Sequence, residues 1–216
     1  MKKLLTLAVA AAMTLSVAAA SATTLNEIIQ RGTVRIACTP LYAATTLPEM
    51  VHRYRQKYPS IAVYILDSLN QQATSRVVAG EADFAFAPQR PSPPELEQQS
   101  VMRDRIHFIC RKDHPLAQRK RVTWSQALQQ PFVTLTQDFT HRLRLDLLRH
   151  SQSLLLEPAH EASFLTTALA MVRSGFGVTA QPGKALALLD SFDLTSRPLI
   201  SPTIERHLSI FLPRNR

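Results

Sequence analysis

Residues 34–88 constrain the fold most, because they alternate short apolar runs with stretches whose apolar residues recur at helical spacing. The runs at residues 34–38, 61–66 and 82–88 predict strands, and the stretches between them predict two helices. The run at 61–66 is apolar at consecutive positions, which is typical of a strand inside a parallel sheet covered by helices. This half of the chain therefore predicts a β-α-β-α-β unit.

A second alternation of strands and helices follows a proline-rich connector. The segment PQRPSPPE at residues 88–95 contains four prolines, which interrupt regular structure. Beyond it we expect strands at residues 106–110, 132–135, 176–180 and 207–212, and helices near residues 123–129, 141–150 and 164–174. Thr123 and Gln126 have the spacing of a capping box. Two such units predict an α/β fold of two lobes, each a mostly parallel sheet flanked by helices.

The first residues have the pattern of an export signal. Lys2 and Lys3 precede an apolar run, and Ala20, Ser21 and Ala22 fit a signal-peptidase site. We expect a signal peptide at residues 1–22, cleavage after Ala22 and a periplasmic location. An uncleaved anchor is the alternative.

Charge and cysteine content restrict the partners and the crosslinks. The formal net charge is +9, and residues 1–22 contribute two lysines and no acidic residue, so +7 remains without them. This charge favours anionic partners of any kind. Cys38 and Cys110 lie in separate predicted strands, and we expect two buried free thiols, with a disulfide left open.

The chain lacks the common catalytic signatures GxSxG, HExxH, GxGxxG, the P-loop and CxxC. We therefore expect no enzyme, no metal and no cofactor. Polar residues instead follow the predicted strands, among them Thr39, Ser68, Thr136 and Ser163. In open α/β sheets the ligand crevice lies beyond the carboxyl ends of the strands, so these residues are candidates for holding a carboxylate.

Several stretches in order resemble the effector-binding domain of LysR-type transcriptional regulators. They are LPEMVHRYRQKYPSIAVYILDS (47–68), VVAGEADFAFAP (77–88), FICRKDHPLA (108–117), VTWSQALQQPFVTL (122–135) and TALAMVRSGFGVTAQP (167–182). The resemblance implies the type 2 periplasmic binding protein fold, with a ligand cleft between two lobes. The domain would span residues 23–216, with lobe I at about 33–89 plus 195–216 and lobe II at about 90–194.

The resemblance also implies which residues touch the ligand, by match to the family's contact loops. They are Thr39, Pro40, Leu41, Ser68, Pro88, Thr136, Ser163 and Phe164. Hydroxyls and backbone N–H groups would bind a carboxylate, and Leu41 and Phe164 would contact an apolar body.

TTLNEIIQRGTVRIA at residues 23–37 resembles the mature start of exported solute-binding proteins, and no winged helix-turn-helix precedes it. The leading hypothesis is therefore a periplasmic receptor for a small organic or amino acid, with a membrane transporter or sensor as partner and no nucleic acid. A LysR-like sensing domain without its DNA-binding part is the alternative, and a homodimer is left open. A dehydratase-like enzyme, with Asp67 or Glu161 as general acid, is a third reading.

Overall fold

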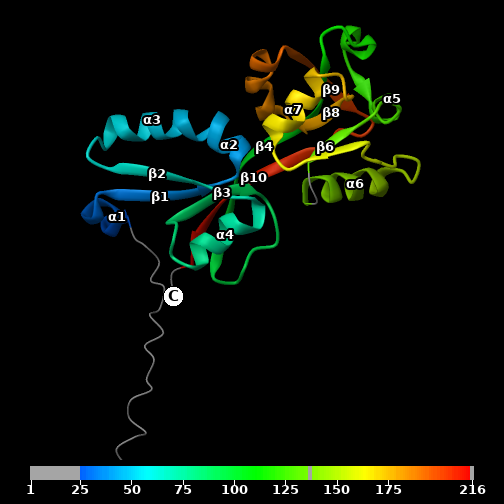
Figure 1. The fold of residues 1–216 in the computed structure, drawn as a ribbon. Coiled ribbons are helices and arrows are strands. Elements are labelled where there is room, and N and C mark those ends of the chain that lie inside the picture. Colours follow the sequence, from blue (N-terminus) through cyan, green and yellow to red (C-terminus); the bar gives the residue numbers. More distant parts are fainter. Residues whose placement is uncertain (1–24, 136–137, 215–216) are drawn as a thin grey trace, which may run out of the picture.

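The computed structural model describes residues 25–135 and 138–214 (Figure 1). The predicted signal peptide and its cleavage site after Ala22 lie outside these residues. The strands are β1 (Thr33–Cys38), β2 (Ala62–Asp67), β3 (Phe84–Pro88), β4 (Leu96–Arg111), β5 (Val122–Thr123), β6 (Val133–Leu135), β7 (His160–Ala162), β8 (Thr179–Pro182), β9 (Leu194–Ile200) and β10 (Glu205–Pro213). The helices are α1 (Leu25–Arg31), α2 (Pro40–Thr45), α3 (Leu47–Lys57), α4 (Asn70–Val78), α5 (Trp124–Ala127), α6 (Asp138–His150) and α7 (Leu165–Arg173), with 3₁₀ helices η1 (Pro115–Gln118), η2 (Gly183–Leu188) and η3 (Asp190–Phe192).

The described strands form one large mixed sheet and one small sheet. The large sheet has the order β2-β1-β3-β10-β4-β9-β5, with β8 also paired to β4, and the small sheet pairs β6 with β7. β1 is parallel to β2 and β3, whereas β10 is antiparallel to β3 and β4. The α/β class is as predicted, and the antiparallel strands at the centre make the sheet mixed.

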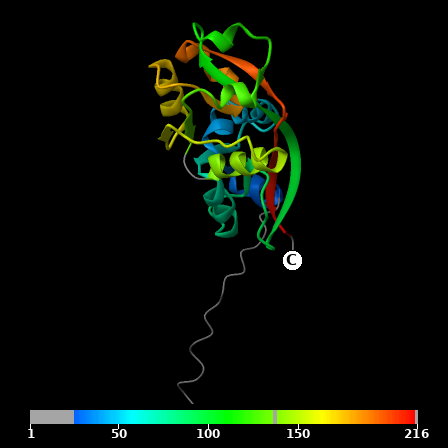
Figure 2. The same ribbon diagram turned by 90° about the vertical axis from the view of Figure 1, so that its right-hand side faces the viewer.

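Strand β4 connects two groups of elements, which lie on either side of it in Figure 1. One group contains β1–β3 and α1–α4, and the other contains β5–β9, α5–α7 and η1–η3. Its first half pairs with β10, and its second half, from Ile106 to Arg111, pairs with β8 and β9. Figure 2 shows β4 curving along one side of the molecule with β10 beside it. The sequence predicted a strand only from residue 106, because residues 97–105 are mostly polar and most of them are exposed. Because β4 belongs to the sheet over its whole length, it holds the two groups next to each other.

Strand β2 contradicts one expectation. Its apolar sequence predicted a position inside the sheet, but β2 is the edge strand, and Tyr64 and Ile65 are exposed. Helix α3 covers one side of it through Val51 and Tyr54 in a cluster with Ile61 and Val63. The expectation was wrong because the order of strands depends on pairing between distant segments, and a run of apolar residues does not encode that order.

Several local predictions are confirmed. Thr123 Oγ1 accepts a hydrogen bond from the Gln126 backbone N–H, and the Gln126 side chain accepts one from the Thr123 N–H, which completes the capping box of α5. Within the described residues no helix is both long and apolar enough to cross a bilayer. Helix α2, which starts directly after Thr39 at Pro40, was not predicted.

Both cysteines are free and fully buried, in different core clusters. Burial raises the pKa of the Cys110 thiol to about 11 and raises that of Cys38 further. The reactive species is the thiolate, so neither side chain is reactive at neutral pH. We expect no thiol to react with a thiol reagent in the native protein and both to react in denaturant. A missing pair of thiols in denaturant would instead show a disulfide.

Candidate ligand-binding site

A cavity of about 700 Å³ lies between the two groups of elements. Its walls come from the loop after β1 and helix α2, the start of α4, the end of β3, helix α6, the start of α7, the end of β8, helix η2 and strand β10. The lining residues are Thr39, Pro40, Leu41, Tyr42, Ala44, Leu69, Gln71, Gln72, Pro88, Leu135, Asp138, Phe139, Arg142, Ser163, Phe164, Leu165, Thr166, Gln181, Pro182, Leu188 and Arg206. A volume of this size suits a small organic molecule.

The cavity brings together most of the residues that the sequence singled out. The predicted residues that line it are Thr39, Pro40, Leu41, Pro88, Ser163 and Phe164. Ser68 is buried instead, and its hydroxyl donates to the Leu66 carbonyl at 2.9 Å, so it serves the local turn. Thr136 lies outside the described residues, although its neighbour Leu135 lines the cavity. That the predicted residues bind a ligand remains a prediction.

Thr39 is the polar residue of the cavity wall with the clearest unmet hydrogen-bonding capacity. It precedes α2 in extended conformation, where a threonine commonly caps a helix, but its side chain makes no capping bond. Its Oγ1 is buried and has no partner. A buried hydroxyl without a partner is unfavourable by about 1–3 kcal/mol. A polar ligand atom in the cavity would remove this cost.

Apolar side chains form much of the remaining wall. Leu41 and Phe164 line it as predicted, and Phe139 and Leu188 join them from α6 and η2. Phe164 is 55% exposed, so its ring offers apolar surface that the described part of the chain does not cover. The wall therefore suits a molecule with both an apolar body and a polar group.

Two arginines of the cavity wall were missed by the sequence reading. Arg142 comes from the second turn of α6, and its Nη1 donates to the Gln89 carbonyl at 2.8 Å. Arg206 comes from β10, and its guanidinium forms an ion pair with Asp146. Neither follows a predicted strand, so no pattern of strand ends could have identified them.

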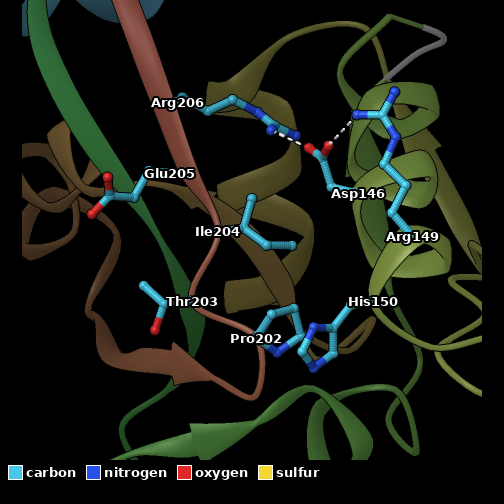
Figure 3. Close-up of a pocket in the computed structure, with 8 residues that line it drawn as sticks. All are labelled: Asp146, Arg149, His150, Pro202, Thr203, Ile204, Glu205 and Arg206. Carbon is cyan, nitrogen blue, oxygen red and sulfur yellow. Dashed lines mark hydrogen bonds and ion pairs between the residues drawn. The ribbon is translucent and has the colours of Figure 1, made fainter.

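Arg206 also lines a second, smaller cavity of about 360 Å³ (Figure 3). In Figure 3 the Asp146 carboxylate lies between the guanidinium groups of Arg206 and Arg149. Arg206 is therefore common to the linings of the two cavities, and its partner Asp146 lines the smaller one.

A buried carboxylate, Asp104, lies beside the larger cavity at the middle of β4. Asp104 Oδ2 accepts hydrogen bonds from the Tyr42 hydroxyl at 3.4 Å and from the Lys184 backbone N–H at 3.1 Å. Burial, and then the negative charge of Asp104, raise the pKa of the Tyr42 phenol, so Tyr42 stays a donor at neutral pH. Asp104 thus connects helix α2 of one group with helix η2 of the other.

His107, three residues further along β4, should make stability depend on pH. Burial lowers its pKa from 6.5, and its Nδ1 is buried without a partner. A lowered native pKa means that the unfolded chain binds the proton more readily, so stability is lost as the pH falls through 6.5 towards the native value. We expect the free energy of unfolding to fall less between about pH 7.5 and 5.5 in His107→Asn than in the parent chain.

Urea unfolding at the two pH values measures this difference. His150→Gln, at an exposed position, is the matched control and should keep the parent dependence. An unchanged pH dependence in His107→Asn would show that other groups cause the loss.

The residues that an enzymatic reading requires are not in the cavity. Asp67 and Glu161 are both exposed, and neither lines the cavity wall. In residues 25–135 and 138–214, no group of three or more histidine, cysteine, aspartate or glutamate side chains is placed to hold a metal ion. Asp138 lines the cavity, whereas the two carboxylates named for a dehydratase do not.

Comparisons with known proteins agree with one another. The family of the LysR substrate binding domain matches residues 29–216. The chain is 27% identical over 180 residues to the uncharacterized HTH-type transcriptional regulator YbhD of Escherichia coli K12, covering 83% of this chain and 57% of that protein. The chain thus spans little more than half of that relative.

Solved structures show the same fold. The cofactor-binding domain of the Cbl transcriptional regulator aligns with a TM-score of 0.76 at 22% identity, over 85% of this chain and 81% of that one. The BenM effector binding domain with its effector benzoate aligns with a TM-score of 0.75 at 21% identity, over 85% and 84% of the two chains. These neighbours confirm the predicted type 2 periplasmic-binding-protein-like fold.

The same matches overturn the leading functional hypothesis. The curated relatives are HTH-type transcriptional regulators, so the interpretation as a periplasmic receptor with a transporter partner is wrong, and the periplasmic location is wrong with it. The error arose because the hypothesis relied on the export-signal pattern and on residues 23–37, while the two-lobed fold, which receptors and regulators share, could not decide between them. The alternative reading, a LysR-like sensing domain, agrees with the family match over most of the chain, and the chain belongs to the family of LysR substrate binding domains.

Proposed function

We propose that the chain is the effector-binding part of a LysR-type transcriptional regulator and that its larger cavity binds a small organic carboxylate. The buried Thr39 hydroxyl, which lines the cavity and lacks a partner, carries this proposal. The family match and the benzoate found with the BenM domain support it. In this proposal the chain is a sensor and not an enzyme, and Asp67 and Glu161 serve no catalytic role.

Ligand binding would change how the two groups of elements are positioned relative to each other. The cavity has walls from both, so a bound molecule stabilises the arrangement in which both walls contact it. The division into lobe I at 33–89 plus 195–216 and lobe II at 90–194 stays a prediction. The first half of β4 pairs with β10 and β9 pairs with its second half, so we propose that the lobes meet at the middle of β4. Pairing of two copies also stays a prediction, which sedimentation velocity would check.

Thermal unfolding of the full chain with a panel of carboxylates, including benzoate, tests the proposal. A ligand at 100 times its dissociation constant stabilises the native state by about 2.7 kcal/mol, which should raise the midpoint by roughly 5–10 °C. We expect Thr39→Val to weaken the best binder about tenfold, because it removes one hydrogen bond to a charged group.

Thr46→Val is the matched control. Thr46 Oγ1 is also buried without a partner at the other end of α2, but it does not line the cavity. Its substitution should leave the affinity unchanged. Equal losses in both variants, or no stabilisation by any carboxylate of a broad panel, would contradict the proposed function.

A further inference from the structure

Two arginines line the larger cavity, and a third lies near one of them. Arg142 and Arg206 line the cavity, and Arg90, in the connector after β3, lies close enough to Arg142 for its charge to lower the pKa of Arg142. They come from three different parts of the chain: helix α6, strand β10 and the connector. The folded structure therefore brings these three positive charges together, and no basic run in the sequence contains them.

This positive charge is only partly neutralised. Among the described residues, Arg142 and Arg90 form no ion pair, and the hydrogen bond of Arg142 goes to the neutral Gln89 carbonyl. Burial, followed by the charges of Arg90 and Arg206, lowers the pKa of Arg142, and Asp138 and Asp146 only partly oppose this effect. The positive charge of the three arginines is therefore reduced, but not cancelled, by Asp138, which lines the same cavity, and by Asp146.

Arg206 has one unmet donor of its own. Its side chain is 13% exposed, and Asp146, its carboxylate partner, is shared with Arg149. Its Nη2 is buried without a hydrogen-bond partner. A buried guanidinium donor that lacks a partner is unfavourable, and an anion in the cavity would supply one.

Thr39 and Arg142 belong to cavity walls from different groups of elements. Thr39 follows β1 in one group of elements, whereas Arg142 lies on α6 in the other. Apolar side chains, among them Leu41 and Phe139, line the same cavity. A molecule with one acidic group for each wall would pair with Thr39 and with the arginines.

We propose that the ligand of this cavity is a dianion, with a first acidic group at Thr39 and a second at Arg142 and Arg206, joined by an apolar body. This inference rests on the proposed function and specifies the ligand class. An acidic group beside Arg142 and Arg206 reduces the repulsion between the two guanidinium groups and gives Arg206 Nη2 an acceptor. Fork-shaped guanidinium groups suit the two oxygens of a carboxylate or the three of a phosphate.

Isothermal titration of the full chain with matched pairs of acids tests the proposal. The pairs are benzoate with phthalate, isophthalate and terephthalate, and butanoate with succinate, since each pair keeps one skeleton and changes the number of carboxylates. We expect at least one diacid to bind tenfold or more tightly than its monoacid. Arg142→Gln should remove this preference and leave the affinity for the monoacid almost unchanged, because a charged hydrogen bond is worth about a factor of ten or more.

Arg149→Gln is the matched control, since Arg149 pairs with the same Asp146 but does not line the larger cavity. It should keep the preference for the diacid. Arg142→Lys, which keeps the charge and loses the fork, should retain part of it. Thermal unfolding of each variant without ligand shows whether it folds.

The outcomes separate the two proposals. If monoacids and diacids bind equally and Arg142→Gln changes neither, the dianion proposal is overturned while the proposed function stands. If inorganic phosphate binds in an Arg142-dependent way and no diacid exceeds its monoacid, the arginines bind a free anion and the proposal is likewise overturned. If no acid of either kind binds, both proposals fail.

Discussion

Replacing Gly177 with alanine is expected to lower the free energy of unfolding by more than about 4 kcal/mol, or to prevent folding. Gly177 has a φ of 134°, and a Cβ at this position would lie 2.0 Å from the Pro131 carbonyl oxygen and 2.8 Å from its carbon. The neighbouring backbone cannot retreat freely. The Val178 N–H donates to the Pro131 carbonyl at 2.9 Å, and the Val133 N–H donates to the Val178 carbonyl at 2.8 Å.

Gly175→Ala is the matched control for this prediction. Gly175 also has a positive φ, of 87°, but the nearest atom to a Cβ there is 4.0 Å away, at the end of the Arg111 side chain. Only the backbone strain of about 1 kcal/mol should therefore appear. Urea unfolding, followed by the fluorescence of Trp124, the single tryptophan, measures both variants. Similar losses in the two would show that the close approach to Pro131 does not matter.

Replacing Asp104 with alanine is expected to lower the free energy of unfolding by about 3 kcal/mol. The Asp104 residue is 8% exposed, and its carboxylate accepts bonds from Tyr42 and from the Lys184 N–H. The variant leaves both donors in a buried site without this acceptor. A Cβ on Gly183 would lie 2.8 Å from Asp104 Oδ1, so the backbone of η2 is packed closely on the carboxylate.

Two further variants make the Asp104 prediction specific. Tyr42→Phe removes one of the two bonds and should lower the free energy of unfolding by about 1 kcal/mol. Asp113→Asn removes a surface ion pair with Arg111, in which the aspartate side chain is 66% exposed, and should leave the free energy of unfolding almost unchanged. Chemical denaturation measures the free energy of unfolding of all three variants. If Asp104→Ala resembled Asp113→Asn, the carboxylate would not be a structural link between α2 and η2.

Local patterns in the sequence predicted most of the elements, and pairing between distant segments decided the rest. The apolar spacing of α3 and α7 and the Thr123 capping box act over one or two turns, so they are legible in the sequence. The edge position of β2 and the pairing of the first half of β4 with β10 depend on segments that are far apart in the chain. Short-range periodicity in the sequence does not indicate the edge position of β2 or the pairing of β4 with β10.

The candidate site divides in the same way. Thr39 and Ser163 were found because a general rule places ligands at the carboxyl ends of strands. Arg142 and Arg206 were missed because they reach the cavity from the second turn of a helix and from a strand that links the two groups. Their contribution depends on the tertiary structure, which brings residues 64 positions apart into one wall.

A crystal structure of the full chain grown with the carboxylate that stabilises it most would test the central claim most directly. The account predicts density for that molecule in the larger cavity, with one acidic group within hydrogen-bonding distance of Thr39 Oγ1. A saturating ligand bound elsewhere, with the cavity containing only water, would contradict it.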